Sequence, residues 1–327
     1  MKKIQAFLAF VLLALCIAAP AAAAPPAQVQ ALKITILSTM VADYGTQAEW
    51  GFSALVEADG HKLLVDTGAA PGTVLANAKA LGIDLSDVED VVLTHNHDDH
   101  TAGLISLREA LMAKNPRAMS RVHVASQIFL SRPEDGGKGA EGNYVLLHRA
   151  EMAKLGIRFV VHDAPAELAP GVWFTGPVPR QYPERNWSGR GVMVVDGKVV
   201  DDNIPEDSSI AFNTASGTVL LSGCGHAGVV NTMTYVHERL LPDQPIVALV
   251  GGFHLFGLDD ERLDWTGEQM RKFGVKTLLG AHCTGFEAVY HLRRQLNLPR
   301  SAAIVAAVGS RYSLKDGISA GSTGLNR

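Results

Sequence analysis

The chain is poor in cysteine, in aromatic residues and in net charge. Only 3 of its 327 residues are cysteines, 6% are aromatic, and the formal net charge is −4. A disulfide-stapled scaffold has many more cysteines, and a nucleic-acid-binding protein usually has a basic surplus, so the composition favours neither class. The length allows one large domain or two smaller ones, and a hydrophobic share of 47% is ordinary for a globular α/β protein. We expect a small-molecule substrate instead of a nucleic acid.

The first 24 residues are predicted to be a secretory signal peptide. Lys2 and Lys3 are followed by an apolar stretch over residues 7–19 and by small residues over 22–24. That three-part order is typical of export signals, and the apolar stretch is short for a membrane span, which is the alternative interpretation. We expect cleavage after Ala24, a domain over residues 25–327, no stable span afterwards, and a periplasmic or secreted protein; the oligomeric state stays open.

Only two cysteines remain after removal of this segment. Cys224 lies two residues before His226, and Cys283 directly follows His282. A disulfide and a metal site are both compatible with this placement.

Strand and helix patterns alternate along most of the chain. The expected strands cover residues 33–39, 52–58, 61–68, 88–94, 120–126, 159–163, 171–176, 217–223, 245–252 and 276–281, and the expected helices cover 72–82, 102–115, 228–241, 259–273 and 285–296. Residues 127–210 are less regular and predict an excursion over one face. The pattern predicts two sheets packed together in a layered α/β sandwich.

The segment "THNHDDH", residues 94–100, concentrates metal-ligating groups directly after an apolar strand. His95 and His97 are two residues apart, so an extended chain presents both imidazoles to the same side. Asp99 and His100 follow where the chain turns, and can face a second cation. Imidazole and carboxylate are ligands that zinc takes readily, so we predict a metal site here instead of a solvated polar loop.

Three later strands each end close to a histidine. These are "LLSGCGHAG" with Cys224 and His226, "ALVGGFHL" with His254, and "LLGAHCTG" with His282. Functional residues gather on loops at the carboxyl ends of strands, and the neighbouring small residues allow close approach of the backbone. The remaining histidines, His61, His123, His148, His162, His237 and His291, are expected to have structural or surface roles.

These motifs carry a family resemblance. "THNHDDH" and the "DTG" at residues 66–68 resemble the signatures of the metallo-β-lactamase fold hydrolases. "EWGFSALVE", "TGPVPR", "PEDSSIAFNT", "SGCGHAGVVN", "GGFHL" and "HCTG" are similar to the branch that includes the archaeal dihydropterin–ribofuranosylaminobenzene phosphate synthase. The resemblance covers nearly the whole mature chain and implies a four-layer αββα sandwich.

The resemblance also implies a distribution of metal ligands. His95 and His97 would hold a first ion, and Asp99, His100 and His282 a second, with Asp66 supporting the metal-binding loop. The family's usual hydrolases have a histidine well before a "GD" turn whose aspartate bridges both ions. Here the turn is "GCGH", so we infer that His226 completes the first site and that Cys224 occupies the place of the bridging carboxylate. Cys224 would either ligate through its thiolate or only pack nearby. Two zinc ions are expected, with a single ion, and with iron or manganese, as alternatives.

Hydrolysis of an ester, lactone, amide or phosphoester by a metal-activated water is the leading functional prediction. Asp99 and His254 are the candidate catalytic residues beside the metals, and His254 is otherwise expected near the ligands or the substrate. The alternatives are an iron-dependent redox or sulfur enzyme, a synthase-type transferase, and a non-catalytic metal-retaining binding protein. Trp173, Arg180 and Trp187 are candidates for substrate contact, Arg180 through an anionic group.

Overall fold

The computed structural model describes residues 26–184, 186, 191–242 and 244–322. The predicted signal peptide and Trp187 lie outside the described residues. The predicted start of the folded domain at residue 25 therefore stays a prediction. None of the helices in the described ranges combines the length and the apolar character that crossing a membrane requires.

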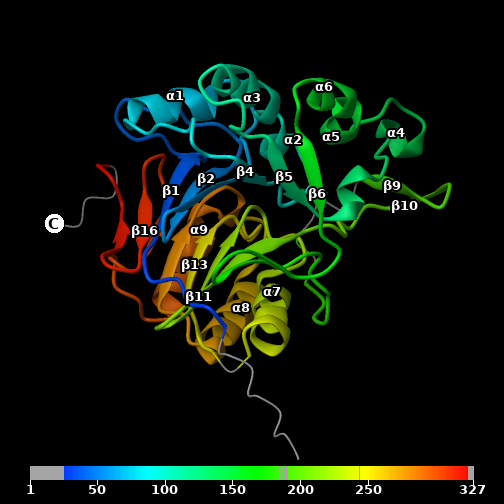
Figure 1. Cartoon of the computed structure of the whole chain (residues 1–327). Helices are drawn as coiled ribbons and strands as arrows, with labels where there is room; N and C mark the ends of the chain where they lie inside the picture. Colours follow the sequence, from blue (N-terminus) through cyan, green and yellow to red (C-terminus); the bar gives the residue numbers. More distant parts are fainter. Residues whose placement is uncertain (1–25, 185, 187–190, 243, 323–327) are drawn as a thin grey trace, which may run out of the picture.

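Two β-sheets lie against each other in the centre of the molecule (Figure 1). The larger sheet has eight strands in the order β17-β16-β1-β2-β3-β4-β5-β6, and the other has seven in the order β15-β14-β13-β12-β11-β8-β7. The first set comprises β1 (Leu32–Ser38), β2 (Ser53–Ala58), β3 (His61–Val65), β4 (Asp90–Val92), β5 (Arg121–Val124), β6 (Arg158–Val161), β16 (Arg311–Ser313) and β17 (Gly317–Ser319). The second comprises β7 (Ala166–Ala169), β8 (Val172–Phe174), β11 (Ser209–Thr214), β12 (Gly217–Ser222), β13 (Ile246–Gly251), β14 (Thr277–Gly280) and β15 (Ala303–Val305).

Helices cover the outer face of each sheet (Figure 1). The first sheet is covered mainly by α1 (Thr73–Ala80) and α3 (Leu104–Met112), and the second by α7 (Val229–Tyr235), α8 (Asp260–Phe273) and α9 (Phe286–Gln295). The shorter helices are α2 (Asp98–Thr101), η1 (Ser126–Phe129), α4 (Glu134–Gly137), α5 (Tyr144–Leu147), α6 (Arg149–Lys154), η2 (Val236–Leu240) and η3 (His282–Thr284). A separate hairpin of β9 (Val192–Val195) and β10 (Lys198–Asp201) extends beyond β6.

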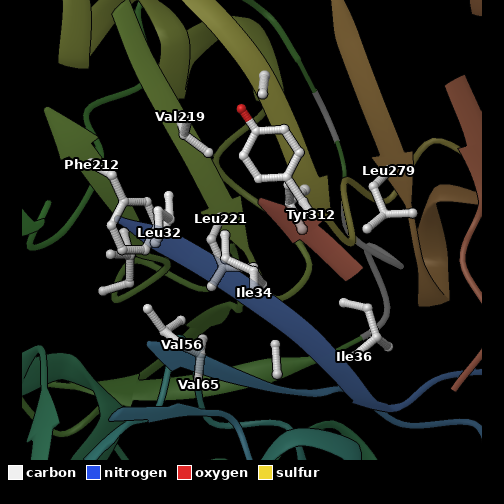
Figure 2. Packing of buried hydrophobic residues seen from close by; sticks show 14 of the residues in the cluster. Leu32, Ile34, Ile36, Val56, Val65, Phe212, Val219, Leu221, Leu279 and Tyr312 are labelled. Atoms are coloured by element: carbon white, nitrogen blue, oxygen red, sulfur yellow. The ribbon is translucent and has the colours of Figure 1, made fainter. Parts of the chain in front are cut away.

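The central strands of both sheets are buried on both faces, which explains the layering. In β2, Val56 points into the layer between the sheets whereas its neighbour Leu55 packs under the helices. In β12, Leu221 and Leu220 divide in the same way between the central layer and the layer under α7 to α9. Figure 2 shows the central layer, where side chains of β1 meet those of β11, β12 and β14. Because side chains alternate along a strand, each sheet buries two faces, and the chain forms the predicted four-layer αββα sandwich.

The three strands that end near histidines are neighbours in the second sheet. β12, β13 and β14 pair in parallel, and their last residues, Ser222, Gly251 and Gly280, stand side by side in register. In the first sheet, β3 and β4 also pair in parallel, so Asp66 and the segment after Val92 leave the sheet together. Parallel pairing therefore brings the loops of five strands to one edge of the sandwich.

The sequence patterns did not predict the last strands of the chain, and they predicted too few elements in residues 127–210. β15, β16 and β17 have three residues each, too few to display a period of two. Residues 127–210 form the predicted irregular excursion but contain the short helices α4 to α6 and the β9–β10 hairpin. Such short elements depend on tertiary contacts, so their own sequence indicates them weakly.

Candidate metal centre

The loop after β4 presents the densest group of metal-ligating side chains. His95 and His100 are fully buried, while His97 and Asp99 are partly exposed. Nε2 of His95 lies 3.0 Å from Nδ1 of His97, and the rings of His95 and His100 have centroids 4.2 Å apart. The short helix α2 begins at Asp98 and turns Asp99 and His100 back toward the first two imidazoles.

Asp66 connects this loop to β3. Its carboxylate accepts hydrogen bonds from the backbone N–H of Thr94 and from Thr94 Oγ1, each at 2.8 Å. It also accepts one from Nδ1 of His100 at 2.7 Å. Asp66 is fully buried and has a φ of 56°, a left-handed conformation that a non-glycine residue adopts at some cost. The structure thus places Asp66 where it supports the loop.

These bonds fix the tautomers of three histidines. His100 donates from Nδ1 to Asp66, and His226 donates from Nδ1 to the carbonyl oxygen of Asn186 at 2.5 Å. Thr94 Oγ1 uses its only hydrogen on Asp66, so it accepts from Nδ1 of His95 at 3.0 Å. In its neutral form each ring therefore has its lone pair on Nε2, the form in which imidazole binds a metal.

The turn after β12 completes a first ligand set. Donor atoms of His95, Cys224 and His226 all lie within 4.8 Å of one another. The ring of His226 is 4.7 Å from that of His95 and 4.9 Å from that of His97, between centroids. Nε2 of His226 is buried and has no hydrogen-bond partner among the described residues. An unpartnered buried nitrogen facing other donors fits a metal ligand.

A second ligand set shares the same cysteine. Donor atoms of His100, Cys224 and His282 also lie within 4.8 Å of one another, and Cys224 Sγ is 3.2 Å from Nε2 of His100. Asp99 Oδ2 is 3.2 Å from Nε2 of His282 and 3.8 Å from Nε2 of His100. Cys224 consequently lies between the two sets, where the sequence predicted a replacement for the bridging carboxylate.

A glycine allows the two sheets to meet at this point. A Cβ on Gly223 would overlap Asp66 Oδ2 and Thr94 Oγ1 and would lie 3.2 Å from Nδ1 of His100. Only glycine lets the turn after β12 approach the supporting carboxylate this closely. The adjacent Cys224 reaches His100 for that reason.

Cys283 is a donor that the predicted ligand set omitted. Its Sγ lies 3.2 Å from Sγ of Cys224 and accepts from the backbone N–H of His254 at 3.2 Å. Cys224, His254 and Cys283 form a further group with donor atoms within 4.8 Å. The signal in the sequence was its position next to His282 at a strand end.

The electrostatics favour neutral imidazoles on one side and a carboxylate on the other. Burial, reinforced by neighbouring histidines, holds the pKa of His95 and of His226 well below the ordinary value. Burial also lowers the pKa of His97 to about 4. Burial opposes ionisation of Asp99, but the histidines around it outweigh burial and keep its pKa below the usual range. Neutral His95, His97 and His226 and an ionised Asp99 are the forms that bind a divalent cation.

His100 differs from the other histidines. Burial lowers its pKa, but the carboxylates of Asp99 and Asp66 outweigh burial and raise the pKa to about 9. The position therefore attracts positive charge strongly. A divalent cation at Nε2 would satisfy the same two carboxylates that otherwise favour a proton.

A cavity of about 470 Å³ opens onto these side chains. Its walls are Trp50, Ala69, His97, Asp98, Asp99, Cys224, His226, His254, His282 and Cys283. His254 and His282 both adopt left-handed conformations, with φ of 48° and 45°. Strained backbone in non-glycine residues is typical of functional sites.

Most of the predicted site residues gather here, but Arg180 lies elsewhere. His95, His97, Asp99, His100, Cys224, His226, His254 and His282 converge, with Asp66 behind them. Arg180 donates from Nη2 to the carbonyl oxygens of Asn203 and Ile204, at 2.5 and 3.1 Å, and is not among the described residues that line the cavity. Its role in substrate binding stays a prediction. Trp173 packs against the core under α7 to α9, and the six other histidines also lie away from the cavity lining.

The sequence patterns also missed Thr94, Asn186 and Trp50. Thr94 orients the adjacent His95 and is itself held by Asp66 from a distant segment, and Asn186 orients His226 from 40 residues away. Trp50 lines the cavity from the loop before β2. For Trp50 the only sequence signal was its place in the "EWGFSALVE" motif.

Glu184 holds the segment that orients His226. Its carboxylate accepts from the backbone N–H groups of Val230 and Asn231, at 3.1 and 2.7 Å, at the start of α7. Burial raises the pKa of Glu184 from 4.5 to about 7, although these amides partly offset burial. Between these pH values the folded protein keeps a proton that the unfolded chain has lost, so its stability falls as pH rises.

We expect Glu184→Gln to weaken this pH dependence. The metal-free variant should lose on the order of 1–2 kcal/mol less unfolding free energy between pH 5 and pH 8 than the metal-free wild type. Urea denaturation at the two pH values measures the difference. Glu268→Gln, which changes an exposed carboxylate on α8, is the control. Equal slopes for wild type and Glu184→Gln would contradict the prediction.

Comparison with known proteins places these residues in a wider context. The sequence profile of the metallo-beta-lactamase superfamily matches residues 51–282. The chain is 29% identical over 271 residues to the 7,8-dihydropterin-6-methyl-4-(beta-D-ribofuranosyl)-aminobenzene-5'-phosphate synthase of Methanocaldococcus jannaschii. The aligned region covers 80% of this chain and 90% of the synthase. An uncharacterized protein of the same organism is 28% identical and covers 76% of this chain and 89% of its own length.

Solved structures show the same arrangement of layers. Tm1679, described as a metal-dependent hydrolase of the beta-lactamase superfamily, superposes with a TM-score of 0.68 at 25% identity, over 86% of this chain and 98% of its own. The metallo-beta-lactamase fold protein YhfI from Bacillus subtilis has a TM-score of 0.50 at 15% identity, over 86% and 99% of the two chains. The likeness to YhfI concerns the fold alone.

Proposed function

Because the chain belongs to the metallo-β-lactamase superfamily, we propose that it is a metal-dependent hydrolase of an ester, lactone, amide or phosphoester. The observation that carries the proposal is the pair of ligand sets that share Cys224. Two adjacent divalent ions are the arrangement that activates a water and stabilises the charge formed when it attacks. Tm1679, described as a metal-dependent hydrolase of the beta-lactamase superfamily, supports the same class.

The donors present fit two ions. His95, His97 and His226 would hold the first, and Asp99, His100 and His282 the second, with Cys224 available to both. The Nδ1 hydrogen bonds of His95, His100 and His226 leave Nε2 of each neutral ring available to an ion, and Nε2 of His226 has no hydrogen-bond partner among the described residues. Imidazole and thiolate together favour zinc over magnesium or calcium, which prefer oxygen ligands.

Side chains of this protein would orient the attacking water and hold the proton for the leaving group. When bound, divalent ions act as Lewis acids and lower the pKa of a coordinated water from near 16 toward about 7. Asp99 is ionised and lines the cavity, so its carboxylate can accept a hydrogen bond from the attacking water. His254 lines the same cavity, and its Nδ1 has no hydrogen-bond partner among the described residues. It is therefore placed to hold a proton destined for the leaving group.

Metal analysis and a substrate screen test this proposal. Purified protein should contain about two zinc ions by mass spectrometry and should hydrolyse members of a panel of esters, lactones, amides and phosphodiesters. Chelation should abolish the activity, and added zinc should restore it. Iron accompanied by oxygen consumption would favour a redox enzyme instead, and metal without turnover on any substrate would favour a binding protein.

A second candidate is a synthase-type transfer, favoured by the relative from Methanocaldococcus jannaschii, which is named as a synthase. Hydrolysis ranks above it because the predicted signal peptide would separate an exported protein from a cytoplasmic biosynthetic reaction. A condensation product formed from two supplied substrates, without hydrolysis of either, would reverse this order.

We also propose export, on the basis of the N-terminal segment over residues 1–24. Expression of the full chain in a bacterium should yield a periplasmic or secreted protein that begins at residue 25. Cell fractionation followed by N-terminal sequencing measures both properties. A cytoplasmic protein that begins at residue 1 would contradict the proposal.

Cys224 provides a direct test of the shared ligand. We expect Cys224→Ser to lower the zinc content from about two ions toward one, because a serine hydroxyl is a far weaker zinc ligand than a thiolate. Cys283→Ser is the comparison variant: Cys283 lies 3.2 Å from Cys224 and shares the further group with His254 but belongs to neither of the two sets, so the protein should retain both ions. Unchanged stoichiometry in Cys224→Ser, measured by mass spectrometry, would show that the thiolate is not a ligand.

A further inference from the structure

Two aromatic side chains stand half-exposed beside the metal centre. Trp50 and Phe256 each expose 53% of their surface. Trp50 lines the cavity, and Phe256, which is not among the described lining residues, packs against Trp50. Large aromatic rings at the opening of a catalytic cavity leave apolar surface in water that a ligand can cover.

The two rings form a corner next to the histidines. Their centroids are 5.8 Å apart and their planes are inclined by 83°. Trp50 also contacts His282, with centroids 5.1 Å apart, and Phe256 contacts His254, again at 5.1 Å. A group bound in this corner would therefore lie directly beside the side chains that face the cavity.

Hydrogen bonds and close packing hold the chain in place at both aromatic residues. The residue before Trp50, Glu49, accepts hydrogen bonds from Ser38 Oγ at 2.6 Å and from the backbone N–H of Ala69 at 3.1 Å. The backbone N–H of Phe256 donates to the carbonyl oxygen of Cys283 at 3.3 Å. Gly285 packs so closely against Phe256 that an added Cβ would lie 2.6 Å from its Cβ. The corner is thus built before any ligand arrives.

We propose that Trp50 and Phe256 bind an aromatic ring of the substrate, which makes the natural substrate an aryl or heteroaryl compound. This inference rests on the proposed hydrolase function. Rings at nearly a right angle offer one π-face and one ring edge to the same guest. Both surfaces favour another aromatic ring over an aliphatic chain, because stacked and edge-to-face contacts match the ring quadrupoles.

Three hydroxamates test the proposal without knowledge of the substrate. Acetohydroxamate, cyclohexanecarbohydroxamate and benzohydroxamate share one metal-binding group and differ in the attached methyl, aliphatic ring or aromatic ring. Calorimetric titration of the zinc-loaded protein should show benzohydroxamate binding on the order of five- to tenfold more tightly than the other two. Chelation of the zinc should abolish binding of all three.

Variants then assign the preference to the corner. Trp50→Ala combined with Phe256→Ala should reduce the preference to about onefold while leaving the affinity for acetohydroxamate unchanged. Trp50→Phe should keep most of the preference, since a ring remains. Tyr44→Ala, which removes an exposed aromatic residue from the same loop outside the cavity lining, should keep all of it.

Three results would overturn the inference. Equal affinity of cyclohexane- and benzohydroxamate in the wild type would show an apolar patch without aromatic selectivity, and a preference that survives the double substitution would place the ring elsewhere. Both results leave the metal centre and the proposed hydrolysis intact. Failure of all three compounds to bind the zinc-loaded protein would overturn the accessible metal centre itself, and the aromatic site with it.

Discussion

Replacement of His97 by alanine will abolish activity and lower the metal content of a protein that remains folded. His97 is partly exposed and lines the cavity, so its removal costs little packing. The rings of His95, His97 and His226 form a triangle with centroids 4.6, 4.7 and 4.9 Å apart, and loss of His97 leaves the first ligand set incomplete. Metal ions contribute several kcal/mol to transition-state stabilisation, so we expect about a thousandfold loss in kcat/KM.

Metal analysis, kinetics and circular dichroism together measure this result. His148→Ala is the matched control, because His148 contacts Glu151 on the surface, 2.9 Å away, and does not line the cavity. It should behave like the wild type. An His97→Ala protein with unchanged metal content would refute the assignment of the site.

Replacement of Asp66 by alanine will have the largest effect on stability. It would leave two buried donors of Thr94 and the Nδ1 hydrogen of His100 without an acceptor. Buried donors left without an acceptor, together with the loss of a buried ion pair, lower the free energy of unfolding by about 3–5 kcal/mol. Alanine also tolerates the left-handed backbone less well than aspartate does. Denaturant unfolding of the metal-free protein should show a loss of that order.

Asp66→Asn distinguishes the contribution of Asp66 to stability from its contribution to zinc binding. Asparagine keeps the size of the side chain and accepts the left-handed backbone, so it should restore much of the stability. Its amide would face Nδ1 of His100 with a donor and thereby favour the tautomer that carries a hydrogen on Nε2. We expect zinc affinity to fall about 10- to 100-fold even where the fold is retained. Wild-type stability in Asp66→Ala would show that these bonds contribute nothing.

The central features of the fold were predictable because they follow from local pattern. The apolar strands that end near His95, His226, His254 and His282 are readable from residue order alone, and so is the concentration of ligands in "THNHDDH". The four-layer arrangement came from the resemblance, which the family profile and the superposition with Tm1679 confirm. Short terminal strands such as β16 escaped prediction because three residues display no period.

Residue order alone sets which residue types stand at the ends of the strands. How these residues combine depends on the packing of the two sheets. The parallel pairing of β12, β13 and β14 aligns three loops, and Gly223 lets Cys224 approach His100 from the opposite sheet. Likewise, Trp50 and Phe256 are far apart in sequence, and they form a corner because two loops meet at one edge of the sandwich. Contacts between distant segments depend on the packing of whole sheets, and no local pattern encodes that packing.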